Sequence, residues 1–153
     1  MPVLVAELGQ GAFFADRLAR QADGRGMLLV AWHRRRPVGD VYLWWERAEE
    51  PELQIFLPGT PLLTHLEVHV DHRARGTGTA LVAAAERELG RRGHRAVALA
   101  VELGNIRAGR LYQRLGYRDW PHPPIRCYSL TDGRGRREAE ICRILVKALA
   151  GRP

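Results

Sequence analysis

The chain has 153 residues and a formal net charge of +7, and all but one of its 24 basic residues are arginine. This length suits one domain with its own core, so we expect a single domain over residues 1–153. No run of eighteen apolar residues occurs, which excludes a membrane-spanning helix. Residues 1–7 lack a basic region ahead of the apolar residues and carry an early acid, so we expect a cytoplasmic protein without a secretory signal.

A basic protein attracts nucleic acids, anionic lipids or anionic cofactors. The sequence has no zinc-finger spacing, homeodomain helix or aromatic RNA-binding signature, so we expect neither a nucleic-acid nor a membrane partner. The two cysteines, Cys127 and Cys142, lie far apart in the sequence. We expect them to be buried free thiols, as in most cytoplasmic proteins.

The first third predicts a short strand over 2–8, an amphipathic helix over 12–21, and a hairpin of strands at 27–32 and 38–45 around a turn at 34–37. Residues 46–61 are expected to form a loop, because prolines and acids crowd it. Its acids are Glu46, Glu49, Glu50 and Glu52. They form either a solvated linker or an acidic rim that attracts a cationic amine.

The chain is organised around residues 62–92. Leu66, Val68 and Val70 alternate with polar residues, which predicts a strand over 62–70. A glycine-rich turn over 71–79 follows, and apolar residues at helical spacing predict a helix over 80–89.

This turn has the chemistry of an anion site. Glycines bring the backbone close to a ligand, and the first N–H groups of the helix are unpaired and carry partial positive charge. Arg73 and Arg75 add two full charges, so we expect a phosphate or pyrophosphate there. A phosphate-loop NTPase is excluded, because the only lysine is the distant Lys147.

A dinucleotide-binding oxidoreductase remains an alternative. Gly76 and Gly78 supply two glycines of its turn, and Glu102 stands where a ribose-binding acid would follow the next strand. Leu81 takes the place of the third glycine and argues against this interpretation.

The last part predicts a strand over 95–102, parallel to the strand over 62–70 through a right-handed crossover. Asn105 is placed to cap a helix that Gly116 ends. A strand over 117–120 and two antiparallel strands over 125–130 and 140–149 complete the chain.

Two segments together resemble the GNAT superfamily of N-acetyltransferases. Arg73-x-x-Gly76-x-Gly78 resembles its R/Q-x-x-G-x-G/A signature, although Val70 stands where the family more often has proline. The segment from Asn105 to Tyr117 resembles its later N-x-x-A-x-x-x-Y-x-x-x-G-[FY] motif. The resemblance covers residues 27–118 closely.

The resemblance implies an α/β (α+β) fold: a mixed sheet of six to seven strands, flanked by helices on both faces, with acetyl-CoA in a gap between the two parallel strands. It implies that backbone N–H groups over residues 75–79 hold the pyrophosphate, that the Val68 N–H polarises the thioester carbonyl, and that Asn105 hydrogen-bonds near the pantetheine. The implied cofactor-binding residues are Val68, His69, Val70, Arg73, Arg75, Gly76, Thr77, Gly78, Thr79 and Asn105.

The resemblance also implies that Tyr112 protonates the departing thiolate. An unperturbed tyrosine is protonated at neutral pH, which suits an acid. The base that deprotonates the amine is expected to be Glu67, because an acid in a buried strand needs a reason. His65, and Glu46 or another loop acid acting through water, are the other candidates.

No metal site is expected. His65 and His69 share a strand face but would lie about 13 Å apart, too far for one ion, and His72 lies beyond the strand. The acceptor is expected to be the amine of a small molecule such as a polyamine or an aminoglycoside-like compound, since Trp44 and Trp45 add aromatic surface to the acidic loop. A peptide amine, or a module that binds acyl-CoA without catalysis, remains possible, and the protein is expected to be a monomer or a homodimer.

Overall fold

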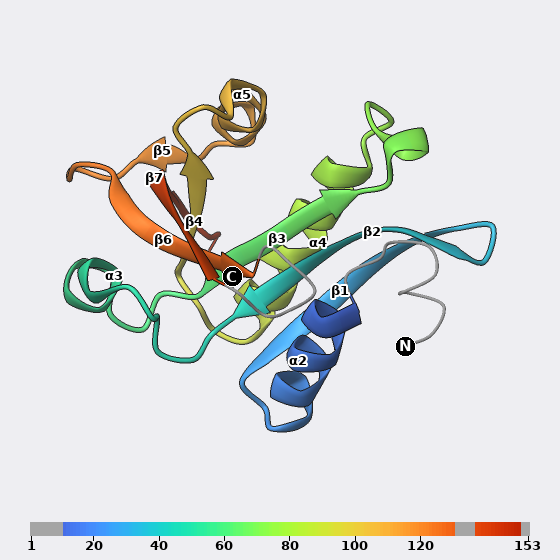
Figure 1. Cartoon of the computed structure of the whole chain (residues 1–153), viewed down its shortest axis with the longest axis horizontal. Coiled ribbons are helices and arrows are strands. Elements are labelled where there is room, and N and C mark those ends of the chain that lie inside the picture. Colours follow the sequence, from blue (N-terminus) through green and yellow to red (C-terminus); the bar gives the residue numbers. More distant parts are fainter. Residues whose placement is uncertain (1–10, 131–136, 151–153) are drawn as a thin grey trace.

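The structure is a computed structural model, and it describes residues 11–130 and 137–150. The strand predicted over 2–8 lies outside these residues. A seven-stranded sheet runs in the order β1-β2-β3-β4-β7-β5, with β6 also paired to β7. Helices α2 (Gly11–Ala22) and α3 (Pro51–Phe56) contribute to the core on one face, and α4 (Thr77–Arg91) and α5 (Ile106–Arg114) to the core on the other. Figure 1 shows α2 in front of the sheet and α4 behind it. The predicted fold class is confirmed.

The first hairpin pairs β1 (Gly26–His33) with β2 (Arg36–Trp44) in antiparallel register. Its turn is shorter than predicted, because only Arg34 and Arg35 lie outside the strands, both with positive φ. Two left-handed residues match the natural twist of a two-residue hairpin. Pro37 accordingly belongs to the strand and not to the turn.

The prediction of an irregular loop over 46–61 is wrong, because α3 occupies Pro51–Phe56. Proline breaks a helix when it lies in the interior, which favours a loop in a proline-rich segment. At the first helical position, however, its missing N–H costs nothing and its fixed φ suits the helix, so Pro51 begins one. Leu53 of α3 packs into the core beside Phe13 and Phe14 of α2.

The predicted strand over 62–70 ends early. β3 covers Leu62–Val68, and Val70–His72 form a single 3₁₀ turn in which Val70 is 65% exposed. Val70 therefore cannot extend the strand as expected. The following helix begins earlier than predicted, since α4 starts at Thr77 directly after Gly76, whose φ of +80° needs glycine.

The second half follows the predicted order. β4 (Ala96–Glu102) is parallel to β3, and α5 leads to the two-residue β5 (Arg118–Asp119). β6 (Ile125–Leu130) and β7 (Arg137–Ala148) are antiparallel. Cys127 and Cys142 are buried free cysteines on these two strands, as expected. No helix in the described part of the chain is long and apolar enough to cross a membrane.

Candidate functional site

The site lies where the two parallel strands separate. β3 and β4 pair only through Leu62↔Ala98 and Leu63↔Leu99, and Figure 1 shows the strands diverging beyond that point. Two cavities of about 370 and 590 Å³ lie along the diverging part. We call the smaller one the acceptor cavity and the larger one the coenzyme cavity, after the ligands that we propose for them under "Proposed function". Both are lined by Leu66, Asn105, Ala108 and Tyr112, so the two meet at these residues.

The coenzyme cavity is built around the start of α4. Its lining includes Gly76, Thr77, Gly78 and Thr79. The N-cap residue Gly76 has no side chain that could cap the helix. The first backbone hydrogen bond of the helix runs from Ala80 N to Gly76 O. The three N–H groups ahead of Ala80 thus remain available for an anion, at the positive end of the helix.

Three arginines line the same cavity: Arg73, Arg107 and Arg114. Arg73 bends back over the turn, where its Nε donates to the Val68 carbonyl at 3.0 Å. Arg107 and Arg114 stand seven residues apart on α5, a spacing that puts them on one helix face. The cavity therefore combines backbone donors with full positive charges, as binding of a pyrophosphate requires.

Backbone groups of β3 point into the gap. The His69 N–H donates to Val38 O of β2 at 2.7 Å. Because successive backbone groups of a strand point to opposite sides, the N–H and C=O of Val68 face away from β2. A slender ligand in the gap can therefore form hydrogen bonds with Val68 as an added strand would.

The structure brings together most of the predicted cofactor residues. Those lining the coenzyme cavity are Val68, Arg73, Gly76, Thr77, Gly78, Thr79 and Asn105, whereas His69, Val70 and Arg75 are not among its lining. Asn105 also accepts a hydrogen bond from Ala108 N at 3.2 Å and so caps α5. Sequence reasoning missed Arg107 and Arg114, although their helical spacing beside the Asn105 motif was a usable signal.

Tyr112 is buried on α5, where it lines both cavities and packs edge-on against Tyr117 at 5.8 Å between ring centroids. Burial raises the pKa of Tyr112 to about 12. Its phenol therefore keeps its proton at neutral pH, which an acid at the junction of two cavities requires.

The acceptor cavity is lined by four carboxylates from three parts of the chain: Glu49 and Glu50 before α3, Glu102 at the end of β4, and Glu140 on β7. Among the described residues, Arg17 of α2 is the only lysine or arginine of this lining. The described part of the lining thus carries more acidic than basic side chains, whereas the described lining of the coenzyme cavity carries only basic ones. Of the four loop acids, considered either as a solvated linker or as an acidic rim, Glu49 and Glu50 line the cavity, and acids that only the fold could bring there join them.

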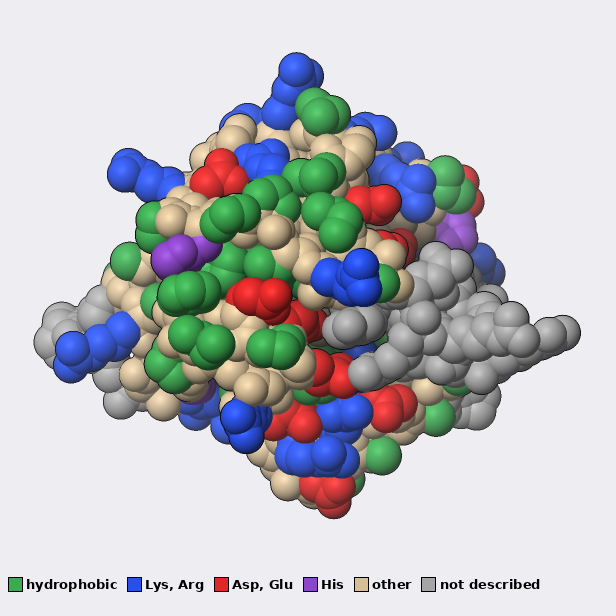
Figure 2. All heavy atoms as spheres, turned by 60° about the vertical axis from the view of Figure 1, so that its left-hand side comes forward, with side chains coloured by type: hydrophobic (Ala, Val, Ile, Leu, Met, Phe, Trp, Pro, Cys, Tyr) green, Lys and Arg blue, Asp and Glu red, His purple; other side chains and the backbone are tan. Residues whose placement is uncertain are grey.

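Hydrophobic side chains surround acidic ones on the face of the molecule seen in Figure 2. Exposed large hydrophobic residues of α3 are Ile55 and Phe56, and those near the end of β4 are Leu103 and Ile106. Phe56 stacks on His122, with ring centroids 3.8 Å apart. A cationic ligand with an apolar body would find both kinds of contact here.

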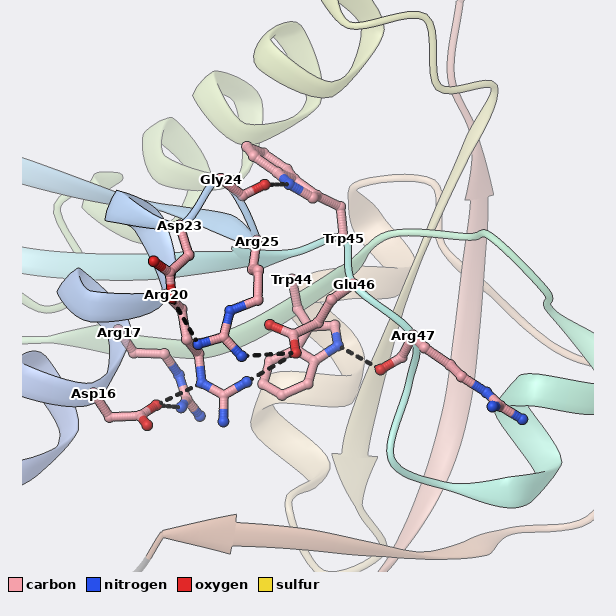
Figure 3. Close-up of polar contacts among 10 residues, drawn as sticks. All are labelled: Asp16, Arg17, Arg20, Asp23, Gly24, Arg25, Trp44, Trp45, Glu46 and Arg47. Atoms are coloured by element: carbon pink, nitrogen blue, oxygen red, sulfur yellow. Dashed lines mark hydrogen bonds and ion pairs between the residues drawn. The ribbon is translucent and has the colours of Figure 1, made fainter.

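An ion-pair network ties α2 to the end of β2 beside the acceptor cavity. Figure 3 shows Arg20 and Arg25 directed toward Glu46, and Arg20 Nη1 lies 3.0 Å from Glu46 Oε1. Arg20 also stacks over Trp44, which lines the cavity. Glu46 is therefore a structural partner of α2 and is not among the cavity lining. Trp45 turns away and donates to Gly24 O at 2.8 Å.

The remaining predicted groups lie as follows. Glu67 is exposed and belongs to the lining of neither cavity, so the premise that it is a buried acid is wrong. His69 and His72 have ring centroids 6.1 Å apart, while His65 contacts Asp40 instead. Within the described residues, no three histidine, cysteine or acidic side chains are placed to hold a metal ion.

Comparison with known proteins identifies the family. The model of the acetyltransferase (GNAT) family matches residues 5–117, and the chain belongs to this family. This result overturns the alternative of a dinucleotide-binding oxidoreductase. The chain is 35% identical over 102 residues to a mycothiol acetyltransferase of Clavibacter sepedonicus, a match that spans 67% of this chain but only 26% of that protein.

Solved structures share the fold. The chain is similar to the ribosomal-protein-S18-alanine N-acetyltransferase of Escherichia coli (TM-score 0.65, 20% identity, 94% of this chain and 79% of that one). It is also similar to the PaiA N-acetyltransferase of Thermoplasma acidophilum in complex with coenzyme A (TM-score 0.64, 16% identity, 95% and 75%). At these identities, the likeness shows the fold alone.

Proposed function

We propose that this protein transfers the acetyl group of acetyl-CoA to the primary amine of a small cationic molecule. The observation that carries the proposal is the pair of cavities of opposite charge that meet at Tyr112. The basic cavity suits the phosphates of the donor, and the acidic cavity suits an ammonium group.

The reaction proceeds by direct attack. The amine forms a C–N bond to the thioester carbon, and the Val68 N–H stabilises the oxygen of the tetrahedral intermediate. The attacking nitrogen loses one proton to a base, the C–S bond breaks, and Tyr112 gives its proton to the leaving sulfur. Backbone N–H groups at the start of α4 hold the pyrophosphate, with Arg73 beside them, and Asn105 lies near the pantetheine.

Two assays test the proposal in sequence. Acetyl-CoA at about a hundred times its dissociation constant stabilises a protein by about 2.7 kcal/mol, which corresponds to a rise in Tm of about 5–10 °C here. NADH serves as the control and should leave Tm unchanged. Release of the CoA thiol is then measured with spermidine, tyramine, tobramycin and the peptide Ala-Arg-Ala.

We expect thiol release with at least one of the three small amines and a slower reaction with the peptide. A faster reaction with the peptide would make this an acetyltransferase of polypeptide amines. Binding of acetyl-CoA without turnover of any amine would contradict the proposed function and leave a module that binds acyl-CoA.

A further inference from the structure

A buried carboxylate lies behind the acceptor cavity. Asp40 of β2 is fully buried, and its Oδ1 is 2.8 Å from Nδ1 of His65 on β3. Acidic side chains are almost never fully buried without a specific partner. The pair therefore points to a defined role for His65. No pattern in the sequence had indicated a role for Asp40.

The pair exists because β3 contains a bulge. Asp40 pairs with Glu67 and Tyr42 pairs with Thr64, so β3 has one more residue than β2 in this interval. His65 has a φ of +55°, which is uncommon for a residue other than glycine. Bulges re-aim side chains, and left-handed residues of this kind gather at active sites.

The bulge directs the imidazole of His65 toward α2. The ring stacks on Phe13 with centroids 3.7 Å apart, and the guanidinium of Arg17 lies 4.7 Å from the same Phe13 ring. All three side chains line the acceptor cavity. His65 directly precedes Leu66, which lines both cavities, so this part of the β3 backbone runs beside their junction while the imidazole lines the acceptor cavity.

Asp40 fixes the tautomer of this ring. A carboxylate oxygen accepts a hydrogen bond, so Nδ1 of His65 carries the hydrogen and Nε2 carries the lone pair. A histidine held in one tautomer by an aspartate is a recurrent arrangement for general bases. Glu67, two residues along β3, lies outside both cavities and lacks this placement.

We propose that His65 is the catalytic base of the acetyl transfer, with Asp40 as its positioning residue; this inference rests on the proposed function. The lone pair of the acceptor nitrogen forms the C–N bond, and the N–H proton passes to Nε2 of His65 directly or through one water. The C–S bond breaks, and sulfur takes its electron pair and the proton of Tyr112. Proton exchange with water then restores His65 and Tyr112.

Four variants test this assignment with the four amines named above. His65→Asn removes the base and retains a residue that tolerates left-handed backbone. It should lower kcat/KM about 10²–10⁴-fold while acetyl-CoA affinity stays unchanged. Glu67→Gln is the matched control on the same strand and should keep wild-type turnover.

The third variant, His65→Gly, also accepts the positive φ and leaves room for an added base. Substituted imidazoles should restore its turnover, with a rate that rises with the basicity of the imidazole. The fourth variant, Asp40→Asn, should shift the ¹⁵N signals of His65 away from the values typical of the tautomer with its hydrogen on Nδ1. A group that only shapes the protein would show neither response.

The outcomes separate the two proposals. Turnover of His65→Asn at the wild-type rate would overturn the role of His65 and leave the acetyltransferase activity intact. Rescue of His65→Gly at a rate that does not depend on the basicity of the added imidazole would do the same. A large loss in Glu67→Gln with none in His65→Asn would return the role to Glu67. Failure of the wild-type protein to acetylate any of the amines would remove the proposed function, and the base with it.

Discussion

The coenzyme cavity and the acceptor cavity are built in different ways. The coenzyme cavity takes much of its lining from one continuous stretch, residues 72–79, and relies there on backbone N–H groups. The acceptor cavity takes its lining from α2, α3 and α5, from the segment before α3 and from β2, β3, β4, β6 and β7, and its charges are side chains. The position of backbone N–H groups depends on the conformation of the chain and not on the side chains beside it, so a short sequence motif is enough to keep them in place. Side chains can be exchanged singly, so the acceptor half is the part of the fold where specificity can change.

The largest expected effect comes at the junction of the two halves. Tyr112→Phe removes the hydroxyl that we propose protonates the leaving thiolate and retains the ring packed against Tyr117. We expect kcat to fall about 10²–10⁴-fold, while acetyl-CoA still raises Tm as in the wild type. Steady-state thiol release and a thermal-shift titration measure the two quantities. Unchanged turnover would show that the junction only positions substrates.

Removal of a charge from the acceptor cavity should change the KM of the amine and not that of acetyl-CoA. Glu102→Gln removes one carboxylate from the acceptor cavity and should raise the KM of a cationic amine about tenfold, the effect of one charge-assisted contact. The KM of acetyl-CoA should not change. Glu52→Gln is the matched control, because Glu52 belongs to α3 but is not among the cavity lining. Equal effects of both variants would mean that the electrostatic field of the whole protein, and not the charge inside the cavity, attracts the amine.

Reversal of a charge in the coenzyme cavity should change the binding of acetyl-CoA and not that of the amine. Arg114→Glu reverses a charge in the coenzyme cavity and should weaken acetyl-CoA binding several-fold, with a smaller effect at high salt. Arg110→Glu makes the same change on α5 outside the cavity and should have little effect. Calorimetric titration at two salt concentrations measures both. A matching loss in Arg110→Glu would contradict the division between the halves.

The smallest expected effect concerns pH. Burial raises the pKa of Tyr112 from 10.0 to about 12, so the folded protein holds this proton more tightly than the unfolded chain does. Its contribution to stability is fully present below about pH 10 and is lost as the pH rises toward 12. The difference in tyrosinate absorbance between wild type and Tyr112→Phe should show this ionisation. Ionisation near pH 10 would mean that Tyr112 is in open contact with water.

Sequence reasoning succeeded where the structure depends on local conformation. The turn before α4 and the motif after Asn105 supplied most of the residues that line one cavity, because each motif is contiguous in the chain. It failed for α3, where Pro51 begins a helix, and for Val70, where the strand had already ended. It also gave Glu67 a role on the assumption of burial. The bulge that separates Glu67 from His65 depends on pairing with β2, which no single segment reveals.

Acids from distant elements were equally beyond local patterns. Glu49 and Glu50 were recognised as a possible rim, because they stand together in one acidic segment. Glu102 was considered only as a ribose ligand, and Glu140 was not considered at all. They reach the acceptor cavity through the pairing of β7 with β4, which joins residues as far apart in the chain as Glu102 and Cys142.

The separation of β3 and β4 places open strand edges inside a sheet. Open edges at the periphery of a sheet can pair with other proteins and lead to aggregation. Here the facing edges beyond Leu63 and Leu99 are flanked by β2 on one side and β7 on the other. A strand from a second protein would have to enter between two strands that are joined at one end, so only the open end of the gap gives access. The protein thus offers unpaired backbone groups to a thin ligand at a place that is flanked by its own strands and not at the outer edge of its sheet.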